Sequence, residues 1–214
     1  MAAPLIFWDV DTQHDFMRAD GRLYVPGSEE IIGTVGALTE YAHANRIPIV
    51  ASADDHVPGH RELSDTPDFR ETFPPHCMRG TPGQAKIAET ALRNPLVIEP
   101  ERAPGALRER IGHHDGDFLL LKHWFDVFTN ENVDLLLEVL APERIVLYGV
   151  ALDVCDRYAL DGLLERRPAG SLWLVEDATR AIDAAAGRSL VEGWRTSGVH
   201  VVSAAEVLAG CVAR

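Results

Sequence analysis

The sequence contains few cysteines, and their spacing argues against two common kinds of structural site. Its 214 residues include Cys77, Cys155 and Cys211, an odd number without a CxxC pair. A disulfide framework requires an even set of cysteines, and a thiolate zinc site requires closely spaced pairs. We therefore expect neither, and we predict a protein of a reducing compartment, the cytoplasm.

Positive charge and long apolar runs are also scarce. The chain has 20 Lys and Arg residues against 33 Asp and Glu residues, so its formal net charge is −13. Nucleic acids and anionic membranes are bound through basic surfaces, so the composition argues against both as partners. The first apolar run, Leu5 to Trp8, is broken at Asp9, and no stretch approaches the ~18 apolar residues of a membrane span. The expected partner is a small molecule, and homo-oligomerisation stays open.

The sequence also lacks internal repeats and low-complexity segments. Hydrophobic residues make up 46% of the chain and charged residues 25%, which is the balance of a globular protein that can bury a full core. We therefore expect residues 1–214 to form a single domain.

Short apolar stretches alternate with amphipathic ones along most of the chain. This alternation predicts a three-layer αβα fold with a mostly parallel, doubly wound, Rossmann-like sheet, whose functional groups lie at the carboxyl ends of the strands. Residues 54–83 lack periodicity and form a stretch longer than an ordinary connection, which is typical of functional loops, and residues 100–116 are a second irregular region. The periodicity predicts strands at 4–11, 47–53, 96–99, 118–122, 144–148, 172–176 and 199–202, and helices at 28–45, 132–140, 153–166, 184–197 and near the C-terminus.

Cys155 lies where a strand is predicted to turn into a helix, within the segment 149–156 (GVALDVCD). Asp153 is a plausible N-cap for that helix. Unpaired N–H groups and the positive end of the helix dipole in a first turn favour a thiolate over a thiol, so we expect Cys155 to be a nucleophile. The alternative is a small buried cysteine that packs like an alanine.

Two further residues could assist such a nucleophile. Asp11 and Lys122 lie at the carboxyl ends of predicted strands and therefore belong to the same edge of the sheet as Cys155. A carboxylate can take the thiol proton and later deliver it to departing ammonia, while a lysine ammonium stabilises both anions. Backbone N–H groups between Ala151 and Cys155 could form an oxyanion hole. Taken singly, Asp11 could be a turn residue and Lys122 a solvated strand end.

The first long loop contains a second cluster of polar residues. Asp54, Asp55 and His56 open it, and His60 and His76 follow. One carboxylate with two or three imidazoles suits a divalent metal ion such as Zn, Fe or Mn, with a coordination position left open. The alternative is that these histidines only bond to the loop backbone.

Several of these elements together resemble a known family. The sequence is similar to the isochorismatase-like cysteine hydrolase superfamily, and within it to the nicotinamidase/pyrazinamidase family, over nearly the whole chain. The HC-x-x-GT-x-G element is specific to the nicotinamidase branch. The matching segments are 11–16 (DTQHDF), 54–56 (DDH), 73–77 (FPPHC), 80–83 (GTPG), Lys122, 149–151 (GVA), Asp153 and Cys155.

The resemblance implies specific roles and an isochorismatase-like fold. It implies that Asp11, Lys122 and Cys155 are a catalytic triad, that Ala151 and Cys155 form the oxyanion hole, and that a cis peptide bond precedes Ala151. It also implies that Asp54, His56 and His76 bind the metal ion, and that the enzyme acts in pyridine nucleotide salvage.

A few positions depart from the family pattern and leave the substrate open. Phe73 stands where tryptophan is frequent, Asp55 where an aromatic residue is common, and His123 follows the lysine. Asp156 directly follows the nucleophile and would oppose a thiolate if its carboxylate pointed at the sulfur. His60 keeps a four-residue offset from His56 that many relatives share, and its part in metal binding stays open.

The expected activity is hydrolysis of nicotinamide to nicotinate and ammonia through a cysteine thioester. The pyridine ring would lie between Phe16 and Phe73 with its nitrogen toward the metal, although both residues could equally be plain core residues. A second hypothesis is another amide or N-carbamoyl hydrolase of the superfamily. A third is a non-catalytic binding protein on the same fold.

Overall fold

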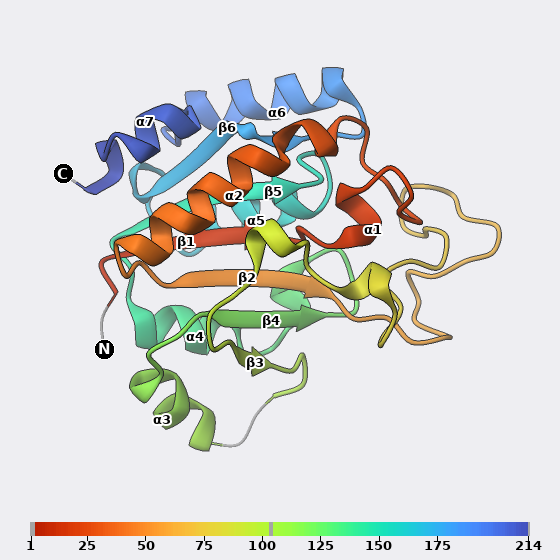
Figure 1. Ribbon diagram of the computed structural model, residues 1–214, viewed down its shortest axis with the longest axis horizontal. Coiled ribbons are helices and arrows are strands. Elements are labelled where there is room, and N and C mark those ends of the chain that lie inside the picture. Colours follow the sequence, from red (N-terminus) through yellow and green to blue (C-terminus); the bar gives the residue numbers. More distant parts are fainter. Residues whose placement is uncertain (1–2, 103–104, 214) are drawn as a thin grey trace.

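A seven-stranded parallel sheet lies at the centre of the computed structural model, which describes residues 3–102 and 105–213 (Figure 1). The strand order is β3-β4-β2-β1-β5-β6-β7, and each neighbouring pair is parallel. This confirms the predicted fold. The strands are β1 (Leu5–Val10), β2 (Ile49–Asp54), β3 (Leu96–Ile98), β4 (Phe118–Lys122), β5 (Arg144–Val150), β6 (Leu172–Arg180) and β7 (His200–Val202).

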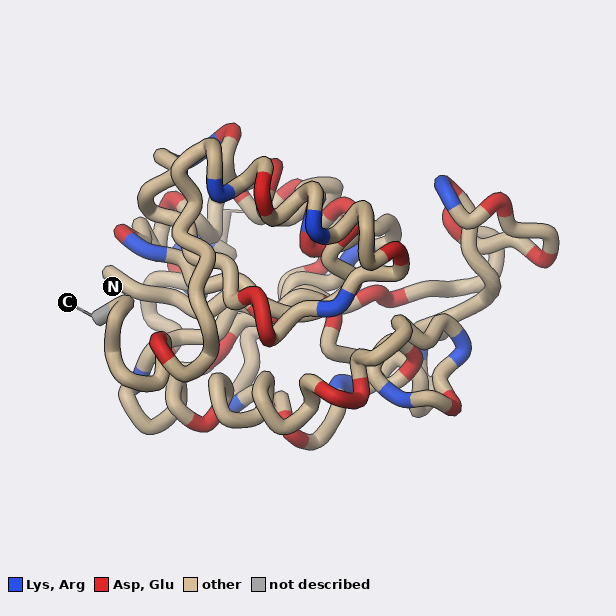
Figure 2. The backbone as a smooth tube through the Cα atoms, turned by 90° about the horizontal axis from the view of Figure 1, so that it is seen from above, with Lys and Arg blue, Asp and Glu red and all other residues tan. Residues whose placement is uncertain are grey.

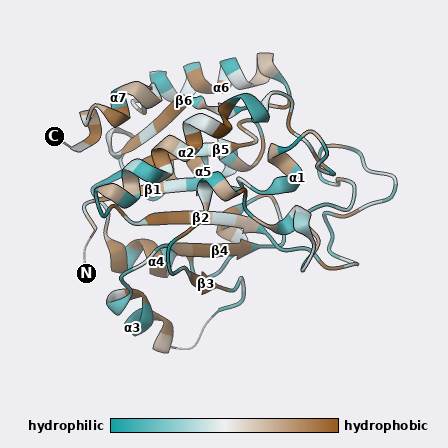
Figure 3. Ribbon diagram, viewed as in Figure 1, coloured by the Kyte–Doolittle hydropathy of each residue, from teal (hydrophilic) through white to brown (hydrophobic). Residues whose placement is uncertain are grey.

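Helices cover both faces of the sheet, and apolar side chains of the central strands lie in a core on each side. In Figure 3 the strand β4 is drawn mainly in the colour of hydrophobic residues. In β1, Trp8 packs into the core on one face and Phe7 into the core on the other, because successive strand side chains alternate in direction. Each large apolar side chain buried in this way stabilises the fold by about 1.5–3 kcal/mol. One core includes side chains of α2 (Ser28–Ala44) and α7 (Ala204–Leu208), and the other includes those of α3 (Ala106–His113), α4 (Val133–Leu140), α5 (Cys155–Leu164) and α6 (Ala184–Thr196).

The order of the strands reverses between β1 and β5. From β1 the sheet continues through β2, β4 and β3 on one side, and through β5, β6 and β7 on the other. Ligands of open parallel sheets bind outside the carboxyl ends of the strands at such a switch point. Asp11 directly follows β1 and Cys155 lies beyond β5, so the two candidate residues flank this point.

Two helices were not predicted. The short α1 (His14–Met17) follows β1, and α3 lies within the stretch 100–116 that has no apolar periodicity. Leu107 and Ile111 are the buried residues of α3, too few to mark a helix in the sequence.

Residues 55–81 project beyond the sheet, and Figure 2 shows acidic and basic positions interspersed there and over the helices. Within the described ranges, none of the helices is long and apolar enough to cross a membrane.

Candidate active site and metal centre

The corner between β5 and α5 is tightly held by its own backbone. The peptide bond between Val150 and Ala151 is cis, as the resemblance implied. The carbonyl of Ala151 accepts the N–H groups of Val154 at 3.0 Å and Asp156 at 3.1 Å. Cys155 is the first residue of α5 and is 7% exposed. The corner therefore presents the sulfur at the carboxyl edge of the sheet.

The predicted N-cap at Asp153 is wrong. Val154 occupies the N-cap position of α5, and no side chain of the described residues caps it. The carboxylate of Asp153 instead accepts the N–H groups of Ile182 at 2.9 Å and Asp183 at 2.8 Å. This side chain therefore fixes the segment after β6 against the corner, a long-range contact that local sequence does not indicate.

Close approach of β1 and β5 requires a glycine. Gly149 has φ 137°, and a Cβ atom there would lie 2.1 Å from the carbonyl oxygen of Val10. Immediately after Val10, Asp11 adopts φ 48°, which is uncommon for a residue other than glycine. The two strand ends can therefore bring Asp11 and the Cys155 corner together.

Asp11, Lys122 and Cys155 meet at this edge. The Nζ atom of Lys122 lies 2.9 Å from Oδ2 of Asp11 and 3.8 Å from Sγ of Cys155. The other oxygen of Asp11 accepts a hydrogen bond from Ser52 at 2.7 Å. Lys122 also donates to Asp54, the last residue of β2. Side chains at or just beyond the carboxyl ends of β1, β2, β4 and β5 therefore converge here.

Burial controls the protonation of the triad. It raises the pKa of the Cys155 thiol well above its ordinary value, although the Lys122 ammonium acts in the opposite direction. In the resting site, burial therefore opposes the thiolate that the helix terminus was expected to favour. Burial likewise raises the pKa of Asp11, again against the effect of Lys122. A carboxyl group with a raised pKa is better suited to accept the thiol proton.

Lys122 remains a cation despite its burial. Burial alone would lower its pKa, but the carboxylates of Asp11 and Asp54 outweigh this and raise it well above the ordinary value. The same ammonium lowers the pKa of Asp54, against the effect of burial. The Lys122 ammonium therefore interacts with a carboxylate of the triad, Asp11, and with one that opens the first long loop, Asp54.

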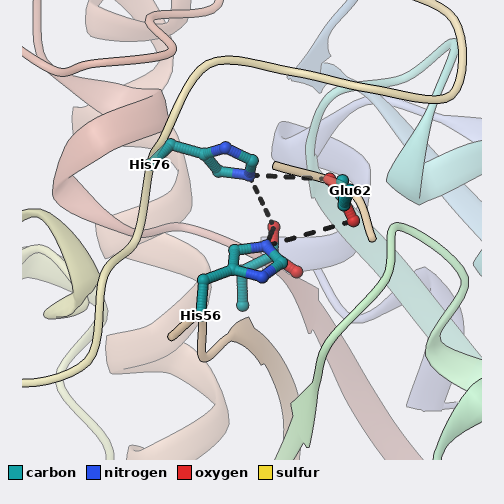
Figure 4. Close-up of side chains that lie close together, drawn as sticks. His56, Glu62 and His76 are labelled. Atoms are coloured by element: carbon teal, nitrogen blue, oxygen red, sulfur yellow. Dashed lines mark ion pairs between the residues drawn. The ribbon is translucent and has the colours of Figure 1, made fainter. Parts of the chain in front are cut away.

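Four residues of that region could hold a metal ion. Asp54, His56, Glu62 and His76 are all buried, and one ligand atom from each lies within 4.8 Å of the others. His76 Nε2 is 3.4 Å from Asp54 Oδ2 and 3.6 Å from Glu62 Oε1, while His56 Nε2 is 3.9 and 4.0 Å from carboxylate oxygens of the same two residues (Figure 4). A tetrahedral ion with bonds of about 2.1 Å separates its ligands by about 3.4 Å, which is comparable.

The unpaired atoms of this group fit a cation. Within residues 3–102 and 105–213, Asp54 Oδ2, His56 Nε2, Glu62 Oε2 and His76 Nε2 are buried without a hydrogen-bond partner. The other ring nitrogen of His76 is 2.7 Å from the carbonyl oxygen of Pro74, which can only accept, so the proton of the neutral ring lies there and the lone pair lies on Nε2. Lone pairs and carboxylates that face one another are the donor set of a divalent ion.

Glu62 was missed in the sequence. No periodicity or motif marks a glutamate in a polar loop, and the loop path alone brings it to the site. The Phe73 N–H donates to the Glu62 carbonyl at 2.7 Å, and Leu63 pairs with Phe73, so the loop folds back on itself. Burial and the carboxylate of Asp54 raise the pKa of Glu62 to about 8. If all four residues bind the metal ion, a coordination position stays open only when the ion has more than four ligands.

Comparison with known proteins identifies the family. A family model, the isochorismatase domain, matches residues 5–206, which is most of the chain. The chain belongs to the isochorismatase family. A nicotinamidase/pyrazinamidase from Mycobacterium tuberculosis (strain ATCC 25618 / H37Rv) is 36% identical over 196 residues, which cover 90% of this chain and 95% of the relative.

Solved structures share the fold. Pyrazinamidase of Pyrococcus horikoshii in complex with zinc has a TM-score of 0.70 and 22% identity, covering 94% of this chain and 99% of the other. N-carbamoylsarcosine amidase from Thermoplasma acidophilum has a TM-score of 0.68 and 24% identity, with coverages of 95% and 97%. Together with the Mycobacterium relative, family membership supports an amidohydrolase.

A narrow pocket joins the sulfur of this isochorismatase-family chain to the metal-ligand group. Phe16 and Phe73 border the pocket and are themselves 5% and 4% exposed. Their ring centroids lie 5.4 and 6.3 Å from that of His76. Both aromatic side chains therefore belong to the pocket wall as well as to the core. The remaining lining residues are Leu23, Val25, Asp54, Glu62, His76, Phe125, Ala151, Val154, Cys155 and Ile182.

The family-atypical acid at position 55 is neutralised by its neighbours. Asp55 is 1% exposed and accepts hydrogen bonds from Arg79 Nε at 2.9 Å and from Gln84 Nε2 at 2.5 Å. His123, the residue after the lysine, lies 3.8 Å from the same carboxylate. Asp55 therefore pairs away from the metal-ligand group, and His60 is likewise outside the four residues that converge there.

Asp156 directly follows Cys155 and is fully buried. Neither carboxylate oxygen has a hydrogen-bond partner among the described residues. Burial raises the pKa of Asp156 well above its ordinary value, and the carboxylates of Asp11, Asp9 and Asp153 raise it further. This favours the neutral acid, which would not oppose an anion on Cys155.

Proposed function

We propose that the protein hydrolyses nicotinamide to nicotinate and ammonia, with Cys155 as nucleophile and a divalent metal ion as cofactor. One observation carries this proposal. The pocket that reaches Cys155 is also lined by Asp54, Glu62 and His76, so a single small ligand can touch both the sulfur and the metal-ligand group. The 36% identity to a nicotinamidase/pyrazinamidase supports it.

Asp11 acts as the base in the proposed reaction. It takes the Cys155 proton as the sulfur attacks the carboxamide carbon, and the Lys122 ammonium stabilises the charges that move between them. Burial raises the pKa of both the thiol and the carboxyl group, so the sulfur is held as a thiol and Asp11 is a stronger base than an exposed carboxylate. Asp11 then gives the proton to the departing nitrogen, which leaves as ammonia.

The corner after β5 stabilises the tetrahedral intermediate. We assign the backbone N–H groups of Ala151 and Cys155 as donors to the oxyanion. Collapse of the intermediate leaves a Cys155 thioester. Water attacks the thioester with Asp11 as base, nicotinate is released, and the proton returns from Asp11 to the sulfur.

Asp54, His56, Glu62 and His76 would hold the metal ion, which was expected to be Zn, Fe or Mn. When bound, the ion supplies a Lewis acid that can bind a ring nitrogen. Phe16 and Phe73 offer flat apolar faces to the pyridine ring and exclude water from its sides. The pocket therefore orients the ring, while the triad performs the hydrolysis.

A second candidate is another amide or N-carbamoyl hydrolase. The same triad could cleave a carbamoyl group, and a protein of this fold with 24% identity is an N-carbamoylsarcosine amidase. The metal-ligand group favours nicotinamide, since a saturated N-carbamoyl amino acid offers no ring nitrogen. A non-catalytic binding protein would have no need for Asp11, Lys122 and Cys155 to converge.

The test is ammonia release from four compounds by protein of known metal content. Nicotinamide and pyrazinamide should be cleaved, because both carry a ring nitrogen in the meta position relative to the carboxamide. Benzamide has the same shape without that nitrogen and should show a clearly higher KM. If only an N-carbamoyl amino acid is hydrolysed, nicotinamide is not the substrate. The proposal that Cys155 hydrolyses an amide-like bond would then still stand.

A further inference from the structure

His60 contacts His56 on the side of the ring that faces away from the metal-ligand group. The Nδ1 atoms of the two residues are 3.3 Å apart, and their rings are nearly perpendicular, at 73°. The opposite nitrogen of His56, Nε2, is the atom that faces Asp54 and Glu62. His60 therefore lies one contact away from the proposed metal ion.

The backbone decides which ring carries the shared proton. The N–H of Val57 donates to Nδ1 of His60 at 3.4 Å, and a backbone amide can only donate. Nδ1 of His60 is therefore an acceptor, so the proton between the two rings lies on Nδ1 of His56. The lone pair of His60 Nδ1 then accepts from two donors, Nδ1–H of His56 and N–H of Val57, which accounts for the similar lengths of these two hydrogen bonds. A neutral His56 with its proton on Nδ1 carries its lone pair on Nε2.

A tight turn brings His60 to this position. The His60 N–H donates to the Val57 carbonyl at 3.2 Å, with Pro58 and Gly59 between them. Gly59 has φ 95°, close to the value that the third position of a type II turn requires, and proline is favoured at the second. The ring of His60 then packs against that of His123, with centroids 4.3 Å apart. The sequence Val-Pro-Gly-His thus turns the ring back toward His56.

The two imidazoles of the metal-ligand group are oriented by different acceptors. The Nδ1 proton of His76 goes to the backbone carbonyl of Pro74, which no substitution of a side chain removes. The Nδ1 proton of His56 goes to a side chain. Outer partners of this kind fix the tautomer and the ring orientation of a metal-binding histidine.

We propose that His60 is a positioning residue for the metal ion, because it holds His56 in the tautomer that presents the Nε2 lone pair to the site. This inference rests on the metal site of the proposed function. Without His60, the buried Nδ1–H of His56 loses its acceptor, and the ring can carry its proton on Nε2 instead. Loss of such an outer partner typically weakens metal affinity by roughly 10–100-fold.

Three variants test the proposal through the zinc Kd of metal-free protein, measured by competition with a chromophoric chelator. His60→Ala should weaken zinc binding by roughly 10–100-fold. His60→Asn keeps an oxygen acceptor near the position of Nδ1 and should restore affinity to within a few fold. His123→Ala is the matched control, because it removes the ring that packs on His60 but leaves the contact with His56, and it should bind zinc like the wild type.

A second measurement reads the tautomer directly. Heteronuclear NMR of isotope-labelled histidine in the metal-free protein should show His56 protonated on Nδ1 in the wild type and a mixture of tautomers in His60→Ala. A wild-type His56 protonated on Nε2, a His60→Ala variant with unchanged zinc Kd, or a His60→Asn variant as weak as His60→Ala would each overturn the proposal. Absence of zinc binding by the wild type would reject the metal site, while the NMR spectrum would still decide the tautomer.

Discussion

The ammonium of Lys122 lies 2.9 Å from the carboxylate of Asp11, and both side chains are fully buried. A single buried cation next to a buried anion must be paired, because an isolated ion loses its hydration without compensation. Lys122 also contacts Asp54. One ammonium therefore compensates two carboxylates, one from the triad and one from the metal-ligand group.

Lys122→Met should therefore lower both stability and activity. Methionine has a similar volume but leaves Asp11 and Asp54 without their cation, and breaking a buried ion pair in this way costs about 3–5 kcal/mol. Urea unfolding measures the stability, and ammonia release measures the activity. A variant as stable as the wild type would contradict the role assigned to this ammonium.

Cys155→Ala should abolish turnover and leave the fold intact. The substitution removes the attacking sulfur but little volume, so the free energy of unfolding should change by only about 1 kcal/mol. Cys211→Ala is the matched control, since Cys211 lies in the last turn of the chain, and it should keep wild-type turnover. Residual thiol-dependent ammonia release by Cys155→Ala would reject the nucleophile.

The order of strands and helices could be predicted because it depends on local apolar periodicity. The strand at 118–122 was predicted with its observed bounds, since its end at Lys122 is marked by a charged residue. Long-range contacts were not predictable in this way. The apolar run of β6 ends near Glu176, yet the strand continues to Arg180, because its later residues Thr179 and Arg180 pair with Gly149 and Val150.

One such long-range contact lies under the first turn after β1. Lys86 is 2.9 Å from the fully buried carboxylate of Asp9, and it also donates to Thr12 at 2.6 Å. Lys86→Met should lower the free energy of unfolding by about 3–5 kcal/mol, because Asp9 would remain buried as an unpaired charge. The double variant Asp9→Asn/Lys86→Met removes both charges and should recover part of that loss. Equal stability of the two variants in urea unfolding would contradict this pairing.

The candidate site was predictable where its residues end strands and unpredictable where they lie in the loop. Asp11, Lys122 and Cys155 follow from strand ends that share one edge of a parallel sheet. Glu62 does not, because its position depends on the pairing of Leu63 with Phe73. Nothing in the local sequence distinguishes Glu62 from the other acidic residues of the projecting loop.

Glu62→Gln should therefore weaken zinc binding as strongly as the loss of a metal ligand does. Loss of a residue that only contacts a ligand would have a smaller effect. The amide keeps the size of the side chain but loses the anionic oxygen that faces His56 and His76. The zinc Kd should rise by more than the roughly 100-fold upper limit expected of outer partners. Glu71→Gln, in the same loop but exposed, is the control and should leave the Kd unchanged. Wild-type affinity of Glu62→Gln would remove this residue from the ligand set.

Asp156 predicts how stability depends on pH. Its pKa is raised in the folded protein by burial and by Asp11, Asp9 and Asp153, so the folded state holds a proton that the unfolded chain releases above about pH 4. The stability that this proton gives is fully present at low pH and is lost as the pH rises toward the folded-state pKa. Over that interval the loss is about 1.4 kcal/mol for each pH unit.

Asp156→Asn should remove this pH dependence, because an amide of the same shape does not ionise. The free energy of unfolding of the variant, relative to the wild type, should increase as the pH rises above about pH 4 toward the folded-state pKa of Asp156. Urea unfolding at several pH values measures this difference, and any constant cost of burying the amide affects all pH values equally. If the difference in free energy of unfolding between Asp156→Asn and the wild type did not change with pH, Asp156 would be ionised in the folded protein. An anion would then lie beside Cys155.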